Sequence, residues 1–359
     1  MAEHAAEYEW RGEGDEAEIV LYAPDDSAIE RLLPAARLPG VESPVYGAAS
    51  PAGFGWAAAS ATYLAPDLLS APRRGLLLVA DTRSENPGMP PQELRGRILR
   101  QLPEAGSRLP SINTSGVGRF CESGARGAAE DGFVEEEDLA LLDVRQGDAD
   151  AMGRRALAAG PHAWESGVEP DPRLVTEILD TEGAESLGLE EGTLVFLLEV
   201  DVGDLGRLTL AAHRERILSR VRAGEFGEES ELPAVPAERG EAEDLVAALD
   251  AAANFADARA ARTLWMLRRV LGDVVGRLDI RAAWRTGGIE YRDGLLVHRN
   301  GLALAADGHV LVCGSYAAAG TGNMWASAPP FGIPGEEGRW PWEETGLLER
   351  LAALDPPEG

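Results

Sequence analysis

The longest regular pattern in this sequence runs from Leu245 to Val275. Its apolar residues recur at helical spacing, at Leu245, Leu249, Phe255, Leu264, Leu267 and Leu271. Apolar residues three or four positions apart lie on one face of an α-helix, so this segment predicts the longest helix of the chain. The remaining elements have to be arranged around a helix of that length.

Continuous apolar runs predict strands. Gly75 to Asp81 predicts a buried strand that ends in a carboxylate, and Thr193 to Val202 predicts another. Leu208 to His213 predicts a shorter strand beside the second one, and a basic helix with several arginines is expected after it. Short strand-like pieces separated by glycine and aspartate turns follow the long helix, at Gly294 to His298, Leu302 to Ala306 and Val310 to Cys313.

Short local sequence motifs predict the secondary structure of several other segments. Capping-box spacing at Ser27 to Glu30 and the paired prolines Pro90 and Pro91 predict two helix starts. Gly53 to Ala61 predicts close-packed strand or turn backbone, and the tail from Ala328 is predicted to be irregular.

Two longer stretches complete the organisation of the chain. Residues 121–191 show helical spacing interrupted by glycine, which predicts a region of amphipathic helices. Residues 224–244 are rich in Glu, Pro and Gly, which predicts an exposed acidic loop.

The charge balance restricts the partners of this chain. It carries 61 acidic and 33 basic residues, a formal net charge of -28, and none of the basic residues is a lysine. Phosphate polyanions are repelled on average, so RNA would need a local arginine-lined cleft, and a protein partner fits the acidity better. The absence of lysine excludes lysyl-nucleotide intermediates and P-loop chemistry. A high-GC genome or a saline cytoplasm would explain both features.

Cysteine content and hydropathy set the remaining limits. The two cysteines, Cys121 and Cys313, exclude a scaffold of several disulfides and an all-thiolate zinc site. No run of about 18 apolar residues occurs, and the first forty residues lack the pattern of a secretory signal. The sequence therefore predicts a folded cytoplasmic protein.

Several segments together resemble the RtcB-type RNA ligases. The most informative are Leu249 to Ala256, Leu296 to Gly301 and Leu232 to Pro236, and Ser50 to Trp56 and Ser115 to Gly118 precede them in the family's order. The resemblance implies an α+β fold, with residues 1–359 forming a single large RtcB-like domain of mixed sheets packed by helices. It also implies joining of RNA 3'-phosphate and 5'-hydroxyl ends with GTP and manganese, as in RNA repair and tRNA splicing.

The resemblance also implies positions for the family's manganese donors, and most have changed. Ala57 and Ser60 stand at an aspartate and a cysteine, Val195-Phe196 at an Asn-His pair, and Ala282 at a histidine. His213 is the donor that remains. A single imidazole cannot hold a transition metal without further donors, so manganese is not expected here. A strand-end histidine satisfied by backbone is the other interpretation of His213.

This chain also lacks the residues that carry out guanylylation in the family. No His-Gly-Ala-Gly-Arg segment carries the nucleophile, and Phe331-Gly332 stands in its place. Asn300 and Glu358 replace two lysines, and Ile217 replaces an arginine. Phosphoramidate formation needs an imidazole in line with the nucleotide phosphate, so covalent use of GTP is not expected.

The candidate site residues that remain are of two kinds. His298 is the possible catalytic residue, although a histidine beside an apolar run also fits a satisfied core position. The candidates for cofactor binding at the family's guanine pocket are Glu199, Asn254, Arg299, Gly314 and Ser315. Helix packing is the alternative for Asn254, and an ion-paired strand carboxylate is the alternative for Glu199.

Three functions follow from these residues. The first is a catalytically inactive RtcB-like protein with a binding or regulatory role in RNA repair or processing. The second is an active, divergent metal-dependent enzyme whose site is rebuilt from His213, Glu199 and His298, which requires these groups to converge. The third is a structural protein unrelated to RNA, because a fold does not fix a function.

Overall fold

The computed structural model describes residues 8–13, 18–23, 30, 33, 41–50, 53–60, 63–81, 100, 111–142, 145–158, 168–174, 185, 187–190, 192–224, 233–292, 295–303, 311–315 and 324–327. The helix start predicted at Pro90 and the tail from Ala328 lie outside the described residues. Of the helix predicted from Ser27, Glu30 and Leu33 are described, and both are helical.

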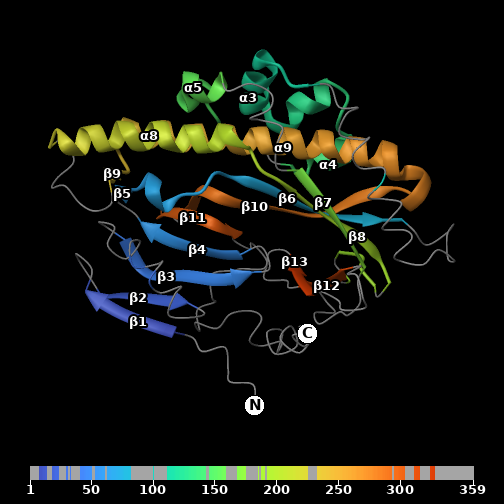
Figure 1. The fold of residues 1–359 in the computed structure, drawn as a ribbon, viewed down its shortest axis with the longest axis horizontal. Helices are drawn as coiled ribbons and strands as arrows, with labels where there is room; N and C mark the ends of the chain where they lie inside the picture. The colour runs from blue at the N-terminus through green and yellow to red at the C-terminus, as the bar shows by residue number, and fades with distance from the viewer. Residues whose placement is uncertain are drawn as a thin grey trace.

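One large sheet organises the described part of the chain (Figure 1). Its eleven strands run in the order β1-β2-β3-β4-β11-β10-β6-β8-β7-β12-β13. Only the pair β2 and β3 is parallel, and the other pairs are antiparallel. The bounds of the strands are β1 Tyr8–Glu13, β2 Glu18–Ala23, β3 Val41–Ser50, β4 Gly53–Ser60, β6 Arg73–Ala80, β7 Val168–Leu174, β8 Leu194–Val200, β10 Leu278–Arg292, β11 Leu295–Ala303, β12 Leu311–Ser315 and β13 Met324–Ser327.

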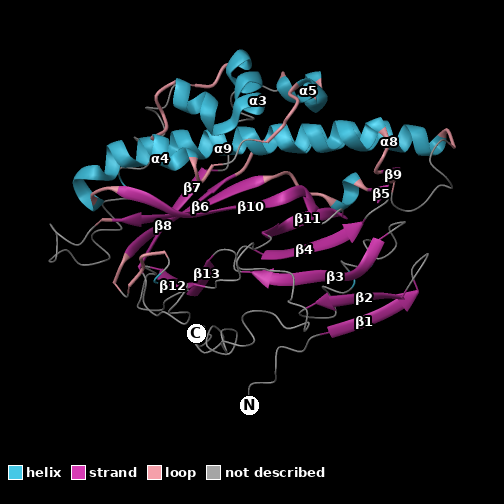
Figure 2. Cartoon of the chain, turned by 180° about the vertical axis from the view of Figure 1, so that it is seen from behind, coloured by secondary structure: helices cyan, strands magenta, loops and turns pink. Residues whose placement is uncertain are grey.

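The helices gather on one side of this sheet, as Figure 2 shows from behind. The two long helices α8 and α9 lie along the sheet, and α3 packs on the outer side of α9. A two-stranded sheet of β5 and β9 lies near α8. The bounds are α3 Thr114–Glu130, α4 Glu136–Leu139, α5 Arg154–Leu157, α8 Asp204–Arg222, α9 Gly240–Val275, the 3-10 turns η1 Pro66–Leu68 and η2 Asp150–Met152, β5 Tyr63–Leu64 and β9 Val235–Pro236. The mixed α+β class is confirmed.

Alternation along the central strands separates two faces of the sheet. Leu76, Phe196 and Leu198 belong to the core that α9 completes, and we call their side the helix face. Leu77 and Val195 alternate with them and lie on the opposite face, where both are fully buried. Because residues paired directly across a ladder share a face, the register assigns each strand residue to one side.

The strongest sequence patterns predicted their elements correctly. The predicted helix at Leu245 to Val275 is α9, and the predicted strands at Gly75 to Asp81 and Thr193 to Val202 are β6 and β8. The prediction for Gly53 to Ala61 corresponds to β4. Among the described helices, none combines the length and the apolarity needed to cross a bilayer.

The predicted strand at Leu208 to His213 is wrong, because these residues belong to α8. The buried residues of α8 include Leu205, Thr209, His213, Ile217 and Val221, which recur every fourth position. That spacing is helical. The window from Leu208 to His213 is too short to show it, so the local apolar content suggested a strand.

Three other boundaries also differ from the predictions. The helical region 121–191 contains a strand, β7, whose Pro170 and Pro172 favour extended backbone in the residues before them. The acidic loop 224–244 ends early, because α9 begins at Gly240 and β9 precedes it. The described residues of the pieces predicted at 294–298 and 302–306 belong to the single strand β11, Leu295–Ala303.

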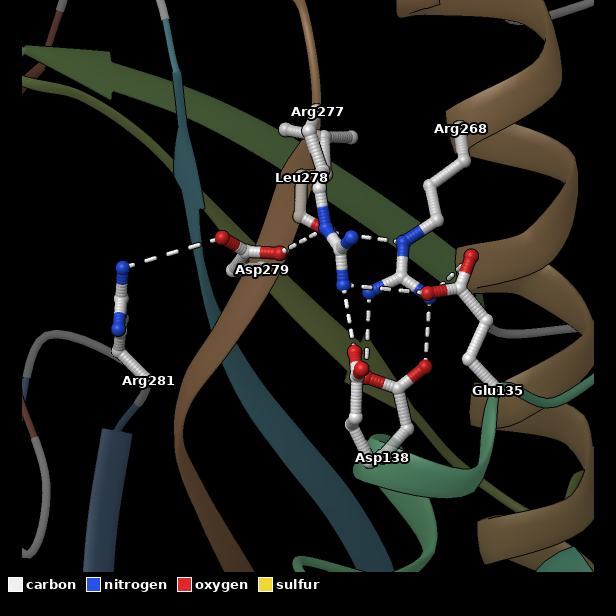
Figure 3. Close-up of polar contacts among 8 residues, drawn as sticks. Glu135, Asp138, Arg268, Arg277, Leu278, Asp279 and Arg281 are labelled. Carbon is white, nitrogen blue, oxygen red and sulfur yellow. Dashed lines mark hydrogen bonds and ion pairs between the residues drawn. The ribbon is translucent and has the colours of Figure 1, made fainter.

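An ion-pair network links the C-terminal end of α9 to α4 and β10 (Figure 3). Arg268 on α9 donates to both carboxylate oxygens of Asp138, at 2.5 and 3.1 Å, and to the Leu278 carbonyl at 2.7 Å. Asp138 is 6% exposed, so this pair is buried. On the exposed side Arg277 pairs with Asp279 and Glu137, and these hydrogen bonds, the one to Asp279 above all, raise the pKa of Arg277.

We expect Asp138→Asn to lower the free energy of unfolding by about 3 kcal/mol, because the buried guanidinium of Arg268 loses its closer counter-charge and keeps only Glu135, at 3.6 Å. Denaturant unfolding measures the change. Glu137→Gln is the matched control, since this carboxylate is 77% exposed where it pairs with Arg277. Its loss should stay below about 0.5 kcal/mol. Equal losses in the two variants would contradict a structural role for the buried pair.

Candidate functional site

His298 lies on β11 and is fully buried on the helix face. Its Nε2 accepts a hydrogen bond from the backbone N–H of Ala65 at 3.2 Å. The neighbours Leu296 and Ile289 belong to a core cluster with Ile217 of α8 and Leu245 of α9. His298 therefore holds the segment before η1 against the sheet.

Glu199 lies on the opposite face, near the end of β8, and is exposed. It pairs in register with Gly75 of β6 and Glu169 of β7. His298 and Glu199 are thus separated by the sheet. A carboxylate there can contact a ligand, but it cannot reach an imidazole on the helix face.

The strand register also places the other two β-strand candidates. Arg299 follows His298 and is paired with Ala57 of β4, which puts this residue on the opposite face. Ser315 is paired with Arg173 of β7, which in turn is paired with Val195 of β8, so Ser315 is on that face too. Gly314 is paired with Leu174. Glu199, Arg299 and Ser315 therefore share one side of the sheet.

Asn254 lies on α9 and is fully buried, and its side chain forms hydrogen bonds with backbone groups. Its Nδ2 donates to the carbonyls of Cys121 and Arg145, each at 2.9 Å, and its Oδ1 accepts from the Arg145 N–H at 2.9 Å. α3 kinks beside it at Gly124, whose φ of 55° suits glycine. Asn254 thus joins α9 to the kinked helix α3 and to the loop at Arg145.

Cys121, one of the backbone partners of Asn254, has a buried free thiol. Burial raises the pKa of this thiol to about 12, and the charge of Glu122 adds to the effect. A thiol that stays protonated at neutral pH is neither a nucleophile nor a metal ligand.

We expect Asn254→Ala to lower the free energy of unfolding by about 2 to 3 kcal/mol, because it leaves buried carbonyls and an N–H group without partners. Asn113→Ala is the control. It removes an exposed side chain that caps α3 through the Gly116 N–H at 2.8 Å, and it should cost about 1 kcal/mol. An Asn254→Ala protein as stable as the control would favour a ligand-lining role over the structural one.

His213 lies on α8, with 1% of its surface exposed. Its Nε2 is 2.8 Å from the Ala151 carbonyl, so the neutral ring carries its proton on Nε2 and donates it. Its Nδ1 is buried without a hydrogen-bond partner. Burial lowers the pKa of His213, against the opposing effect of the Ala151 hydrogen bond. The residue thus joins α8 to η2 as a neutral group.

The lowered pKa of His213 makes folding sensitive to acid. Below its unfolded value of about 6.5, the unfolded chain binds a proton that the folded ring excludes, so stability falls as pH drops toward the folded pKa. We expect the free energy of unfolding to decrease more between about pH 7.5 and about pH 5.5 in the wild type than in His213→Gln. Denaturant unfolding at both pH values measures this, and equal decreases would show that His213 has no part in it.

The five manganese-donor positions implied by the RtcB resemblance do not fall together. Ala57 and Ala282 are on the opposite face, since Ala57 pairs with Arg299 and Ala282 with Leu77. The other positions are on the helix side: Ser60 pairs with Leu296, Phe196 is in the core, and His213 is on α8. The described part of the chain holds no group of three His, Cys, Asp or Glu side chains placed around one metal ion.

The arginines of α8 are the expected basic surface, and four of them are paired with carboxylates. Arg214 pairs with Asp67, Arg216 with Asp244 at 2.7 Å, and Arg220 with Glu241 at 3.4 Å. Arg207 pairs with Asp204 within the helix. Carboxylates of neighbouring elements thus offset much of the positive charge that this helix could offer to RNA.

A buried charge cluster on the helix face has no counterpart in the sequence predictions. Asp257 of α9 is fully buried and accepts hydrogen bonds from Arg74 of β6 and Arg285 of β10. The signal was present, because Asp257, Arg259 and Arg262 interrupt the most apolar helical pattern of the chain. Charged residues on a buried helix have partners, and those partners mark a polar site.

Comparison with models of known protein families finds no match for this chain, and no curated protein matches it significantly. The resemblance to RtcB ligases therefore rests on the quoted residues and their order.

Proposed function

We propose that this protein is a divergent RtcB-like protein without the family's ligase chemistry, and that it has a binding or regulatory role in RNA repair or processing. In this proposal residues 1–359 form a single RtcB-like domain. The family's manganese centre and covalent guanylate are lost, and a binding surface remains on the opposite face of the sheet.

One observation carries the noncatalytic part of this proposal: the donor positions are divided between the two faces. A metal ion binds nitrogen and oxygen ligands at about 2 Å, so its donors must surround one point. Ala57 and Ala282 lie across the sheet from Phe196 and His213. Restoring donor side chains at these positions would not by itself make a single centre, which supports loss of the metal chemistry.

The residues matched to the guanine pocket support retention of a binding surface. Glu199, Arg299 and Ser315 share the opposite face, on three different strands. The carboxylate of Glu199 is exposed on this face, and a carboxylate can recognise a polar ligand. The alternative, an active rebuilt enzyme, needs His213, Glu199 and His298 in one place, and their positions on α8 and on the two faces of the sheet count against it.

The test is guanylylation in the presence of manganese. We expect purified protein incubated with α-labelled GTP and manganese to retain no label after denaturation in detergent, and to hold less than stoichiometric metal. Retained label would overturn the noncatalytic proposal. Parallel reactions with His298→Gln and His213→Gln would then identify the modified histidine, because glutamine cannot form the phosphoramidate.

A further inference from the structure

Two arginines flank Asp257 on the helix face. Arg74 of β6 and Arg285 of β10 are direct cross-strand neighbours, so both are on the side covered by α9. The Nε of Arg74 donates to one oxygen of Asp257, and an Nη of Arg285 donates to the other. Like charges directly opposite in a ladder repel one another, and the shared carboxylate offsets this repulsion.

Arg74 retains an unused donor. Its side chain is 4% exposed, and its Nη2 is buried without a hydrogen-bond partner. A guanidinium presents five N–H groups in a planar fork, and leaving one unsatisfied in the interior costs free energy. Both oxygens of Asp257 are already engaged, so a further acceptor beside Arg74 would be stabilised.

Arg145 adds a third guanidinium, which is partly exposed and contacts β10 at Ile289. Its side chain is 31% exposed, and its Nη1 donates to Asp250 at 2.8 Å and to the Ile289 carbonyl at 3.4 Å. Burial lowers the pKa of Arg285, and the charges of Arg74 and Arg145 lower it further. The charge of Asp257 acts in the opposite direction and raises this pKa. Asp257 and Asp250 are the carboxylates that pair with these three arginines, so the cluster keeps a net positive charge that favours an anion.

We propose that Arg74, Arg285 and Arg145 form a binding site for a phosphate group. Phosphate supplies several acceptor oxygens and negative charge, and the arginine fork matches its geometry. This site goes beyond the proposed function, because it is on the helix face and uses none of Glu199, Arg299 or Ser315.

The same chemistry could come from two sources, free inorganic phosphate or the terminal phosphate of an RNA. Calorimetric titration of the full chain with potassium phosphate, at ionic strength matched with potassium chloride, tests the site itself. Short RNAs with a 3'-phosphate or a 3'-hydroxyl end then compete with inorganic phosphate. Competition by the phosphorylated RNA alone identifies the RNA end as the ligand, and competition by neither identifies free phosphate.

We expect saturable phosphate binding that Arg74→Met abolishes and that Arg145→Met weakens by about tenfold. Arg145 is the second variant because it is partly exposed, so its substitution tests the site even if Arg74→Met does not fold. Arg207→Met is the control, since that residue is 67% exposed on α8 and should leave binding unchanged. No saturable binding of phosphate or RNA to the wild type, or equal binding by Arg145→Met, would overturn the proposal.

Discussion

The burial of α9 on all sides is the constraint on which the rest of this structure depends. From Ala251 to Leu264 every residue is buried, with α3 on one side and the sheet on the other. Alanines make up much of this stretch, so neighbouring backbone can approach closely: a Cβ added at Gly147 would lie 2.5 Å from Ala251. Polar groups on such a helix have no access to water, and each one needs a partner from another element.

The partners of these polar groups determine which elements surround α9. Asn254 binds the kink of α3 and the loop at Arg145, Asp257 binds two central strands, and Arg259 donates to the Asp201 carbonyl after β8. Arg262 lies over the rings of Phe120 and Phe133, at 5.6 and 4.9 Å from their centroids. Four polar residues of one helix thus specify the positions of α3, β6, β8 and β10 around it.

The sequence could predict elements whose pattern is long or continuous. α9 repeats its apolar spacing over many turns, and β6 and β8 are unbroken apolar runs. Each pattern therefore indicated a single type of secondary structure. α8 was harder to predict, because the buried residues on one side of this helix include a threonine and a histidine. Their helical spacing is visible only over the whole helix. β7 was missed because it lies within a region whose apolar spacing predicted helices, and its pairing with β8 decides its conformation.

The candidate site was less predictable, because its geometry depends on contacts between distant residues. Asn254 binds Arg145, 109 positions away, and Asp257 binds Arg74, 183 positions away. No local spacing carries that information. The resemblance supplied chemical roles for single positions, but strand register alone decides which of them share a face. A shift of one residue moves a side chain to the other face, so small errors in matching positions have large consequences for a proposed centre.

The acidity of the chain changes how a phosphate site on it would act. A net charge of -28 repels anions at long range, so diffusional encounter with a phosphate is slowed at low salt. Binding must then come from short-range contacts with guanidinium groups in a low-dielectric interior, where charge-assisted hydrogen bonds are strong. Arg214 and Arg216 of α8 are paired with carboxylates, whereas Arg74 keeps a buried donor without a partner. Phosphate recognition in this protein is therefore expected where water is excluded, on the side of the sheet that α9 covers.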